Sequence, residues 1–236
     1  MNKFALFSCL SLLTVAAVAE TIEINVGSVG VTAITSSLKN TIVAVSFADL
    51  EEGGAIKVAD LVKTDNLTEG DQLAIFNGGS TYDTWTLLGG AWVKNDRTYT
   101  VGADGLVAGE GAAADVTTKA VGTGFWLCRK NQPSGQFTFY TYGKPVDTKT
   151  STIQANTVTL VGNPTQQNVN LNDAGKVEGA RFADYIMTIE DGVPQYYMYN
   201  GSGWGRNSDS GVVTLPAVAP GHGFWIQTKA NATINW

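Results

Sequence analysis

Hydrophobic residues in this chain recur at every second position over short segments, and clusters of glycine, asparagine and aspartate separate those segments. A period of two is typical of strands with one buried face, and glycine-containing dipeptides mark turns. The pattern predicts strands at 40–47, 71–77, 82–87, 91–94, 123–129, 157–161, 185–189, 195–199 and 223–228, with strand-like segments at 20–31, 137–142 and 230–236. One helical candidate, 49–62, is interrupted by Gly53-Gly54. The expected fold is therefore all-β with little helix.

The chain also contains an internal repeat. Segments 40–45, 71–76 and 85–92 resemble 156–161, 184–189 and 199–204, and one phrase occurs twice, as Gly122, Gly124, Phe125 and Trp126 and as Gly221, Gly223, Phe224 and Trp225. Self-similarity of this kind predicts repeated folding units. We expect two related β-sandwich-like modules at 38–130 and 154–236, an N-terminal strand or arm at 20–37, and a linker or hairpin at 131–153. The first copy is longer mainly through a Gly- and Ala-rich segment, 100–115, which is expected to be a loop.

The repeated phrase suits a tight turn that leads into a strand. Its glycines permit positive φ or the close approach of another backbone, and the consecutive Phe and Trp project to opposite faces of the strand. We expect one ring in each copy to fill a core and the other to cover the opposite face or an interface. A phosphate-binding loop would need a third glycine and a following helix, whereas a strand is expected here.

The first 19 residues have the pattern of a secretory signal peptide. Lys3 supplies the positive end, 4–15 the apolar stretch and Ala17-Val18-Ala19 the cleavage site, so the mature chain is expected to begin at Glu20. The apolar stretch is shorter than the roughly 20 residues of a membrane-spanning helix. No transmembrane helix is expected in the mature chain. We expect a secreted protein at the cell surface, or in the periplasm or outer envelope, of a bacterium.

Composition narrows the expected partners. One of the 15 basic residues, Lys3, leaves with the signal peptide, so 14 basic residues face 21 acidic ones and the net charge is −7. Such a surface repels nucleic acid and anionic lipid. The mature chain keeps one cysteine, Cys128, which excludes a disulfide within the chain and is expected to be a small buried hydrophobe. Charged residues make up only 15% of the chain, which fits association with further copies or with other envelope proteins.

Several motifs together resemble a known kind of module. Residues 160–164 (LVGNP) and 220–225 (PGHGFW) are similar to the opening and the close of a module in an uncharacterised family of exported bacterial surface proteins with paired β modules. Residues 40–50 resemble the opening of the other module, although Ser46-Phe47-Ala48 stands where the pattern has Gly-Asn-Pro. The resemblance covers most of the mature chain. It implies β-structured envelope or extracellular material without established catalytic residues.

No catalytic residue and no cofactor is expected, and we do not expect an enzyme. His222 is the single histidine and occupies the variable position of the repeated phrase, where Thr123 stands in the other copy, so it is expected to be a turn residue rather than a base. Asp71 and Asp184 are candidates for a glycosidase-like carboxylate pair. Their equivalent positions in the two copies instead favour a structural role, such as capping the turn before a strand.

Metal ligands are sparse as well. Zinc sites use three or four His or Cys ligands, which one histidine and one mature cysteine do not supply. The oxygen-rich groups that could hold calcium are Asp104, Glu110 and Asp115, and Asn170, Asn172 and Asp173. Neither group has the ligand spacing of an EF-hand loop, so solvated loops are favoured and no metal site is assigned.

Aromatic residues of the expected hairpins are the remaining candidates for a ligand or interface site: Trp85, Trp92, Tyr196, Tyr197, Tyr199 and Trp204. Core packing, an assembly interface and stacking on sugar rings stay open for this group. Tyr196 and Tyr197 are consecutive in an expected strand and must point to opposite faces, which predicts that at least one of them faces solvent.

The expected function is that of a secreted, non-catalytic structural or adhesive protein of the bacterial envelope or extracellular matrix. Self-assembly is suggested by the low charge and by terminal strands at 22–26 and 230–236, because edge strands pair between subunits. One alternative is a carbohydrate-binding module that uses the hairpin aromatics. Another is an outer-membrane β-barrel, suggested by the alternation from Thr228 to the terminal aromatic Trp236.

Overall fold

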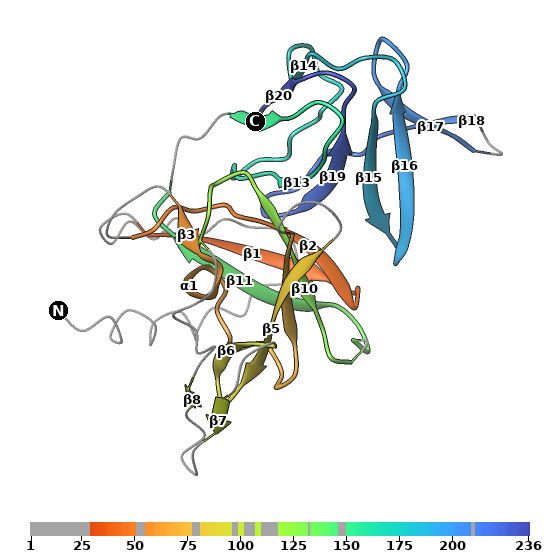
Figure 1. Ribbon diagram of the computed structural model, residues 1–236. Coiled ribbons are helices and arrows are strands. Elements are labelled where there is room, and N and C mark those ends of the chain that lie inside the picture. Colours follow the sequence, from red (N-terminus) through yellow and green to blue (C-terminus); the bar gives the residue numbers. More distant parts are fainter. Residues whose placement is uncertain are drawn as a thin grey trace.

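The computed structural model of the chain describes residues 29–50, 55–76, 81–95, 99–101, 107–109, 118–131, 133–145, 150–208 and 211–236 (Figure 1). The expected signal peptide, the strand-like residues 20–28 and the loop carboxylates Asp104, Glu110 and Asp115 lie outside the described residues. In the described part, strands dominate and the one α-helix, α1 (Val58–Leu61), is a single turn. The expected all-β fold with little helix is confirmed, and this turn is the helical part of the candidate 49–62 among its described residues.

A five-stranded antiparallel sheet organises the first half of the chain. Its strand order is β2-β10-β4-β5-β6, and its strands are β2 (Asn40–Ala44), β10 (Gly124–Cys128), β4 (Gln72–Phe76), β5 (Tyr82–Leu88) and β6 (Ala91–Lys94). The closing strand β10 therefore lies between the opening strand β2 and the hairpin strand β4.

A six-stranded antiparallel sheet organises the second half. Its strand order is β13-β19-β15-β16-β17-β18, and its strands are β13 (Val158–Gly162), β19 (Gly223–Gln227), β15 (Tyr185–Glu190), β16 (Val193–Tyr199), β17 (Trp204–Ser208) and β18 (Gly211–Thr214). Apart from the added edge strand β18, this order corresponds strand by strand to that of the five-stranded sheet. Descent of both from one duplicated unit stays a prediction.

Smaller sheets cover one face of each large sheet. β1 (Gly30–Ser36) pairs with β11 (Phe137–Gly143), and the three-stranded sheet runs β12-β20-β14, with strands β12 (Thr150–Ile153), β20 (Ala232–Asn235) and β14 (Val177–Glu178). Ile34 and Phe139 from the first pair enter the core under the five-stranded sheet, and Ile153 and Ile234 enter the core under the six-stranded sheet. We call these two sandwiches module 1 and module 2.

These small sheets bear on three expectations. The segment 131–153, expected to be a linker or hairpin, contains β11 of module 1 and β12 of module 2. β1 lies within the N-terminal strand or arm expected at 20–37 and contributes Ile34 to the module 1 core; its buried positions also include Thr32 and Ser36, which a hydrophobic pattern does not mark. The C-terminal strand β20 is not a free edge, because it pairs with β12 on one side and β14 on the other.

Two further strand pairs lie in module 1. β3 (Ile56–Lys57) pairs with β9 (Thr118–Lys119), and β7 (Tyr99–Val101) pairs with β8 (Val107–Gly109). The Gly- and Ala-rich segment expected to be a loop therefore includes the short β7–β8 hairpin. Within the described ranges, no helix combines the length and the apolar character that a membrane span requires.

The register of the sheets shifts part of the expected repeat by two residues. Gly124 lies opposite Ala44 in module 1, and Gly223 lies opposite Gly162 in module 2, so Ala44 corresponds to Gly162 and not to Leu160. In the same way Trp85 corresponds to Tyr197, because both lie opposite the equivalent positions of β4 and β15. A slip of two leaves every side chain on the same face of its strand, so the alternating pattern cannot detect it.

Candidate binding surface

The repeated Gly-x-Gly-Phe-Trp phrase lies where the two modules meet. Phe125 and Phe224 are buried in the cores of their own modules. Trp126 and Trp225 point to the opposite faces and join a third apolar cluster, which the outer faces of the two large sheets form between them. The expectation that one ring fills a core and the other covers an interface agrees with this arrangement.

The first glycine of each phrase makes a reciprocal contact with the other module. The Gly122 carbonyl accepts a hydrogen bond of 3.1 Å from the Gly162 amide, and the Gly221 carbonyl accepts one of 2.8 Å from the Ala44 amide. Both glycines have positive φ, +86° and +71° respectively. Because Gly162 and Ala44 are equivalent positions, the two bonds are related by an approximate two-fold relation between the modules.

The second glycine of each phrase leaves room for a side chain of the other module. A Cβ atom placed on Gly124 would lie 2.8 Å from Leu160, and one placed on Gly223 would lie 2.5 Å from Ile42. Leu160 and Ile42 are themselves equivalent, since each lies opposite the tryptophan of its own phrase. Gly-x-Gly is therefore required for the close approach of the modules.

Four of the six hairpin aromatics lie inside the module cores, and a fifth, Tyr199, packs against one. Trp85, Trp92, Tyr197 and Trp204 are each at most 2% exposed and belong to the module cores. Tyr199 packs against the module 2 core, with its ring centroid 5.2 Å from that of Trp204. A ring inside a core has no free face for stacking, so Trp85, Trp92, Tyr197 and Trp204 are corrected to structural residues, while Tyr199 is half-buried against the core.

Tyr196 is the exception. It is 57% exposed, whereas its neighbour Tyr197 is fully buried, which confirms that one of the two faces solvent. Tyr196 belongs to a row of paired outer-face residues that crosses four strands: Leu160, Trp225, Met187 and Tyr196. Module 1 covers Leu160 and Trp225 at one end of this row, and Tyr196 lies in solvent at the other.

The exposed part of this surface extends across neighbouring strands. Tyr185 lies opposite Met198, and Met198 is 51% exposed. The rings of Tyr185 and Tyr196 are in edge-to-face contact with their centroids 6.0 Å apart. Val212 on the edge strand β18 is 71% exposed and occupies the same face by its register. We call Tyr185, Tyr196, Met198 and Val212 the exposed face.

Module 1 is polar at the equivalent positions. Thr84 and Thr86 correspond to Tyr196 and Met198, and Gln72 corresponds to Tyr185. Their side chains bond to one another and to Asn95: Gln72 donates to Thr86 at 3.2 Å, Thr86 to Asn95 at 2.6 Å, and Asn95 to Thr84 at 2.8 Å. The two modules thus share a fold but differ in the surface they present.

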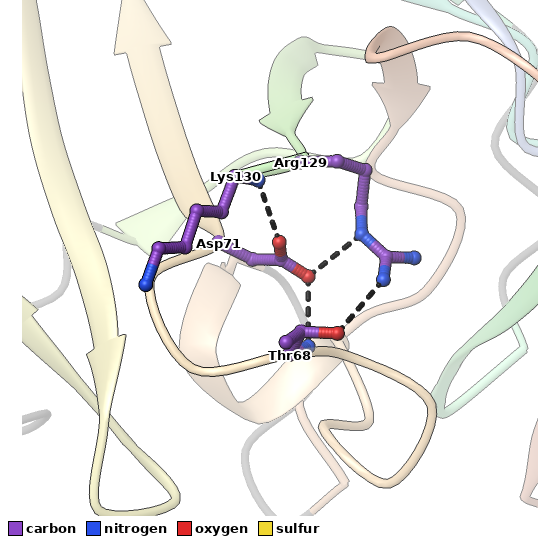
Figure 2. Close-up of polar contacts among 4 residues, drawn as sticks. All are labelled: Thr68, Asp71, Arg129 and Lys130. Atoms are coloured by element: carbon purple, nitrogen blue, oxygen red, sulfur yellow. Dashed lines mark hydrogen bonds and ion pairs between the residues drawn. The ribbon is translucent and has the colours of Figure 1, made fainter. Parts of the chain in front are cut away.

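The carboxylate of Asp71 is a candidate that the structure places in a structural role. It is fully buried and accepts bonds from the backbone amides of Thr68 and Lys130, each at 2.8 Å, and from the Arg129 Nε at 2.7 Å (Figure 2). The guanidinium of Arg129 also lies 4.3 Å from the ring centroid of Phe137. The carboxylate therefore joins the loop before β4 to the end of β10.

Asp184 repeats this arrangement in module 2. Its carboxylate accepts bonds from the backbone amides of Arg181 at 2.7 Å and Lys229 at 2.9 Å. Thr228 stands where module 1 has Arg129, so the second carboxylate has no equivalent ion pair there. Asp71 and Asp184 belong to separate cores and each caps its own turn, which agrees with the structural role expected for them.

A third carboxylate, Glu190, forms a polar cluster on the inner side of the six-stranded sheet. The Tyr197 hydroxyl donates to it at 2.5 Å, and the Thr188 hydroxyl donates to the same oxygen at 2.9 Å. Burial and the bond to Glu190 raise the pKa of Tyr197, so its hydroxyl keeps its proton and remains a donor. Arg206 lies 3.9 Å from the other carboxylate oxygen.

A polar cavity of about 250 Å³ lies at the junction of the modules. Its lining comes from the end of β1 and the turn after it, from β2, from the residue before β11, and from the turns before β16 and β19, and includes Ser36, Thr41, Gln136, Asp191 and His222. Ser36 Oγ already accepts bonds from the Leu38 amide and the Thr41 hydroxyl. Burial lowers the pKa of His222, which favours the neutral imidazole.

The second oxygen-rich group that could hold calcium is occupied by protein contacts. Asn170 donates to Asp173 at 2.8 Å, and Asn172 accepts a bond of 2.5 Å from the Trp204 amide. Across the described ranges, no three His, Cys, Asp or Glu side chains lie together in a group suited to a metal ion.

Comparisons of the chain with protein-family models, with curated proteins and with solved structures find no match. The sequence contains a signal for the exposed face, because Thr84 and Thr86 of module 1 occupy the positions equivalent to Tyr196 and Met198 of module 2. Sequence similarity matches Trp85 with Tyr199, two residues away from the structural equivalent Tyr197, so the sequence alone does not reveal this difference.

Proposed function

We propose that the protein is an exported, non-catalytic structural or adhesive component of the bacterial envelope or extracellular matrix, and that it attaches to its partner through the exposed face. The observation that carries the proposal is the uninterrupted apolar row from Leu160 to Tyr196. One end of this row already serves as a packing surface, and the other end lies in solvent. Contiguous exposed apolar surface of this kind commonly marks a contact site.

Two further features support the proposal. The signal-peptide pattern of residues 1–19 supports export, and the strong resemblance of the two strand orders supports a duplicated scaffold. The polar groups with the most distinctive geometry, around Asp71 and Asp184, hold loops to strands inside the modules, which is a structural use of carboxylates.

Cell fractionation tests the proposal. The full chain, expressed in a bacterium, is expected in the envelope or the medium in a processed form that begins at Glu20. Tyr196→Thr, which installs the side chain of Thr84, is expected to release the protein from its attached fraction. Val193→Thr is the matched control, because Val193 is 54% exposed on the same strand but at an alternate position. Unprocessed protein in the cytosol would contradict export, and unchanged attachment of the Tyr196 variant would contradict the role of the exposed face.

A second candidate function is carbohydrate binding. The specific observation in its favour is the exposed Tyr185–Tyr196 ring pair, because aromatic faces stack on sugar rings. Binding of the mature chain to a glycan array, lost in Tyr196→Thr and kept in Val193→Thr, would support it. Trp92 and Trp204 are not suitable test positions, since both are buried in the cores.

A further inference from the structure

We propose that the exposed face binds the same face of a second copy of this chain, and that the mature protein is a two-fold symmetric dimer. This inference rests on the proposed function, for which it names the partner. It follows from three observations: what the covered half of the outer face already binds, the charge of the exposed half, and the difference between the two modules.

The covered half of the outer face binds another β-sheet of the same kind. Trp225 and Leu160 pack against Ile42, Phe76 and Trp126 of module 1, and the Phe76 and Trp225 ring centroids lie 4.8 Å apart in an edge-to-face contact. The chain therefore already contains a sheet-on-sheet contact made by these outer faces. The outer face of the six-stranded sheet is also apolar beyond Met187, so this exposed part is best suited to pack against another sheet face.

The exposed half carries no charge among its described positions. By strand register, the outward-facing positions of β15 to β18 are Tyr185, Met187, Ile189, Pro194, Tyr196, Met198, Gly205, Asn207, Val212 and Thr214. The charged residues Glu190 and Arg206 belong to the inner side, where they meet each other. Since the mature chain carries 14 basic and 21 acidic residues, a net charge of −7, two copies approach with least repulsion through an uncharged face. A charged partner would find no counter-charge there.

The difference between the modules limits the assembly to two chains. The equivalent positions in module 1 are polar and bonded to one another, as the Gln72–Thr86–Asn95–Thr84 chain shows. Each copy thus presents one such face in the part of the chain that the structure describes. A single self-complementary patch forms a closed dimer, because two copies that bind through this patch leave no free patch for a third copy. In Figure 1, β16, β17 and β18 lie on the side of the six-stranded sheet away from module 1, where a second copy has access.

Analytical ultracentrifugation of the mature chain over a range of concentrations tests this inference. The wild type is expected to sediment as a dimer that dissociates on dilution. The Tyr196→Thr/Met198→Thr variant, which carries the side chains of module 1, is expected to raise the dimer Kd at least about tenfold, a change of about 1.4 kcal/mol. Tyr196→Lys, which places like charges against each other across the two-fold axis, is expected to give a monomer. Val193→Thr is expected to dimerise as the wild type does.

The outcomes separate this inference from the proposed function. A wild type that stays monomeric up to about 1 mM, where binding would be worth no more than about 4 kcal/mol, overturns the dimer. Dimers that persist unchanged in both Tyr196 variants also overturn it. If such a monomer still attaches to the envelope or to a glycan through Tyr196, the proposed function stands with a different partner. If the wild type dimerises but remains unprocessed in the cytosol, the dimer stands and the proposed function fails.

Discussion

Replacement of Asp71 by Asn tests how much a buried carboxylate stabilises module 1. The carboxylate accepts three bonds, two from backbone amides and one from the Arg129 Nε. Asparagine is nearly isosteric but has one acceptor oxygen. Even in its best orientation, with that oxygen toward Thr68 and Arg129, the Lys130 amide loses its acceptor and the Arg129 guanidinium loses its counter-charge.

The magnitude follows from these losses. A buried donor left without a partner costs about 1–3 kcal/mol, and each bond that loses its charge assistance weakens by about 1 kcal/mol. We therefore expect Asp71→Asn to lower the free energy of unfolding by about 3–5 kcal/mol, in the range for a broken buried ion pair. Asp184→Asn is expected to cost about 1 kcal/mol less, or about 2–4 kcal/mol, because Thr228 replaces the arginine there and two amide bonds alone are affected.

A double-mutant cycle provides the internal control. Arg129→Thr converts the site around Asp71 into the form found around Asp184. In that background the cost of Asp71→Asn is expected to fall to about that of Asp184→Asn, which corresponds to a coupling energy of about 1 kcal/mol. The free energies come from urea unfolding followed by tryptophan fluorescence, with Trp85 and Trp92 in the module 1 core as reporters. Equal costs at the two aspartates, or a coupling below about 0.5 kcal/mol, would refute the reasoning.

Three other predictions concern single positions. Gly223→Ala is expected to destabilise the protein by about 1–3 kcal/mol, since the new methyl would lie 2.5 Å from Ile42. Gly135→Ala has open space around it and is expected to change stability by less than about 0.5 kcal/mol. Similar urea midpoints for the two variants would contradict the close approach of the modules. Burial lowers the pKa of His222, so the unfolded chain takes up a proton first as the pH falls. The free energy of unfolding is therefore expected to fall below pH 6.5, by at most about 1.4 kcal/mol per pH unit. His222→Thr should remove this dependence, and an unchanged slope between pH 7.5 and 5.5 in that variant would contradict the role of His222. Burial raises the pKa of Cys128 to about 11, so roughly one thiol in a thousand is ionised at pH 8. Mass spectrometry should find slow alkylation of Cys128 by iodoacetamide in the folded chain and rapid alkylation after denaturation. Fast labelling of the folded chain would be inconsistent with this burial.

Much of the fold could be predicted from the alternation of residues. The strands from Asn40, Gln72, Tyr185 and Gly223 lie where the period of two indicates them, and the turns at Gly89-Gly90 and Asp191-Gly192 adopt positive φ. β1 lies within the N-terminal strand or arm expected at 20–37, but its bounds were not predicted, because Thr32 and Ser36 occupy buried positions that a hydrophobic pattern does not mark.

The candidate site was only partly predictable. Tyr196 was among the expected aromatics, but Trp85, Trp92 and Trp204 were not distinguishable from it, since an aromatic residue in a hairpin satisfies the same pattern whether it faces a core or solvent. Met198 and Val212 were not expected at all. Their importance depends on the register between strands, which determines what shares a face with Tyr196.

Residue order alone determined where most strands of the two large sheets lie, and that Phe and Trp in each repeated phrase face opposite ways, because these properties depend on neighbours along the chain. It also predicted a repeated plan. Tertiary structure alone decided which outer face is covered and which is open. Each sheet is assembled from strands that are distant in the sequence, and module 1 covers only half of the outer face of the six-stranded sheet. The exposure of Tyr196 therefore depends on contacts that local sequence does not encode.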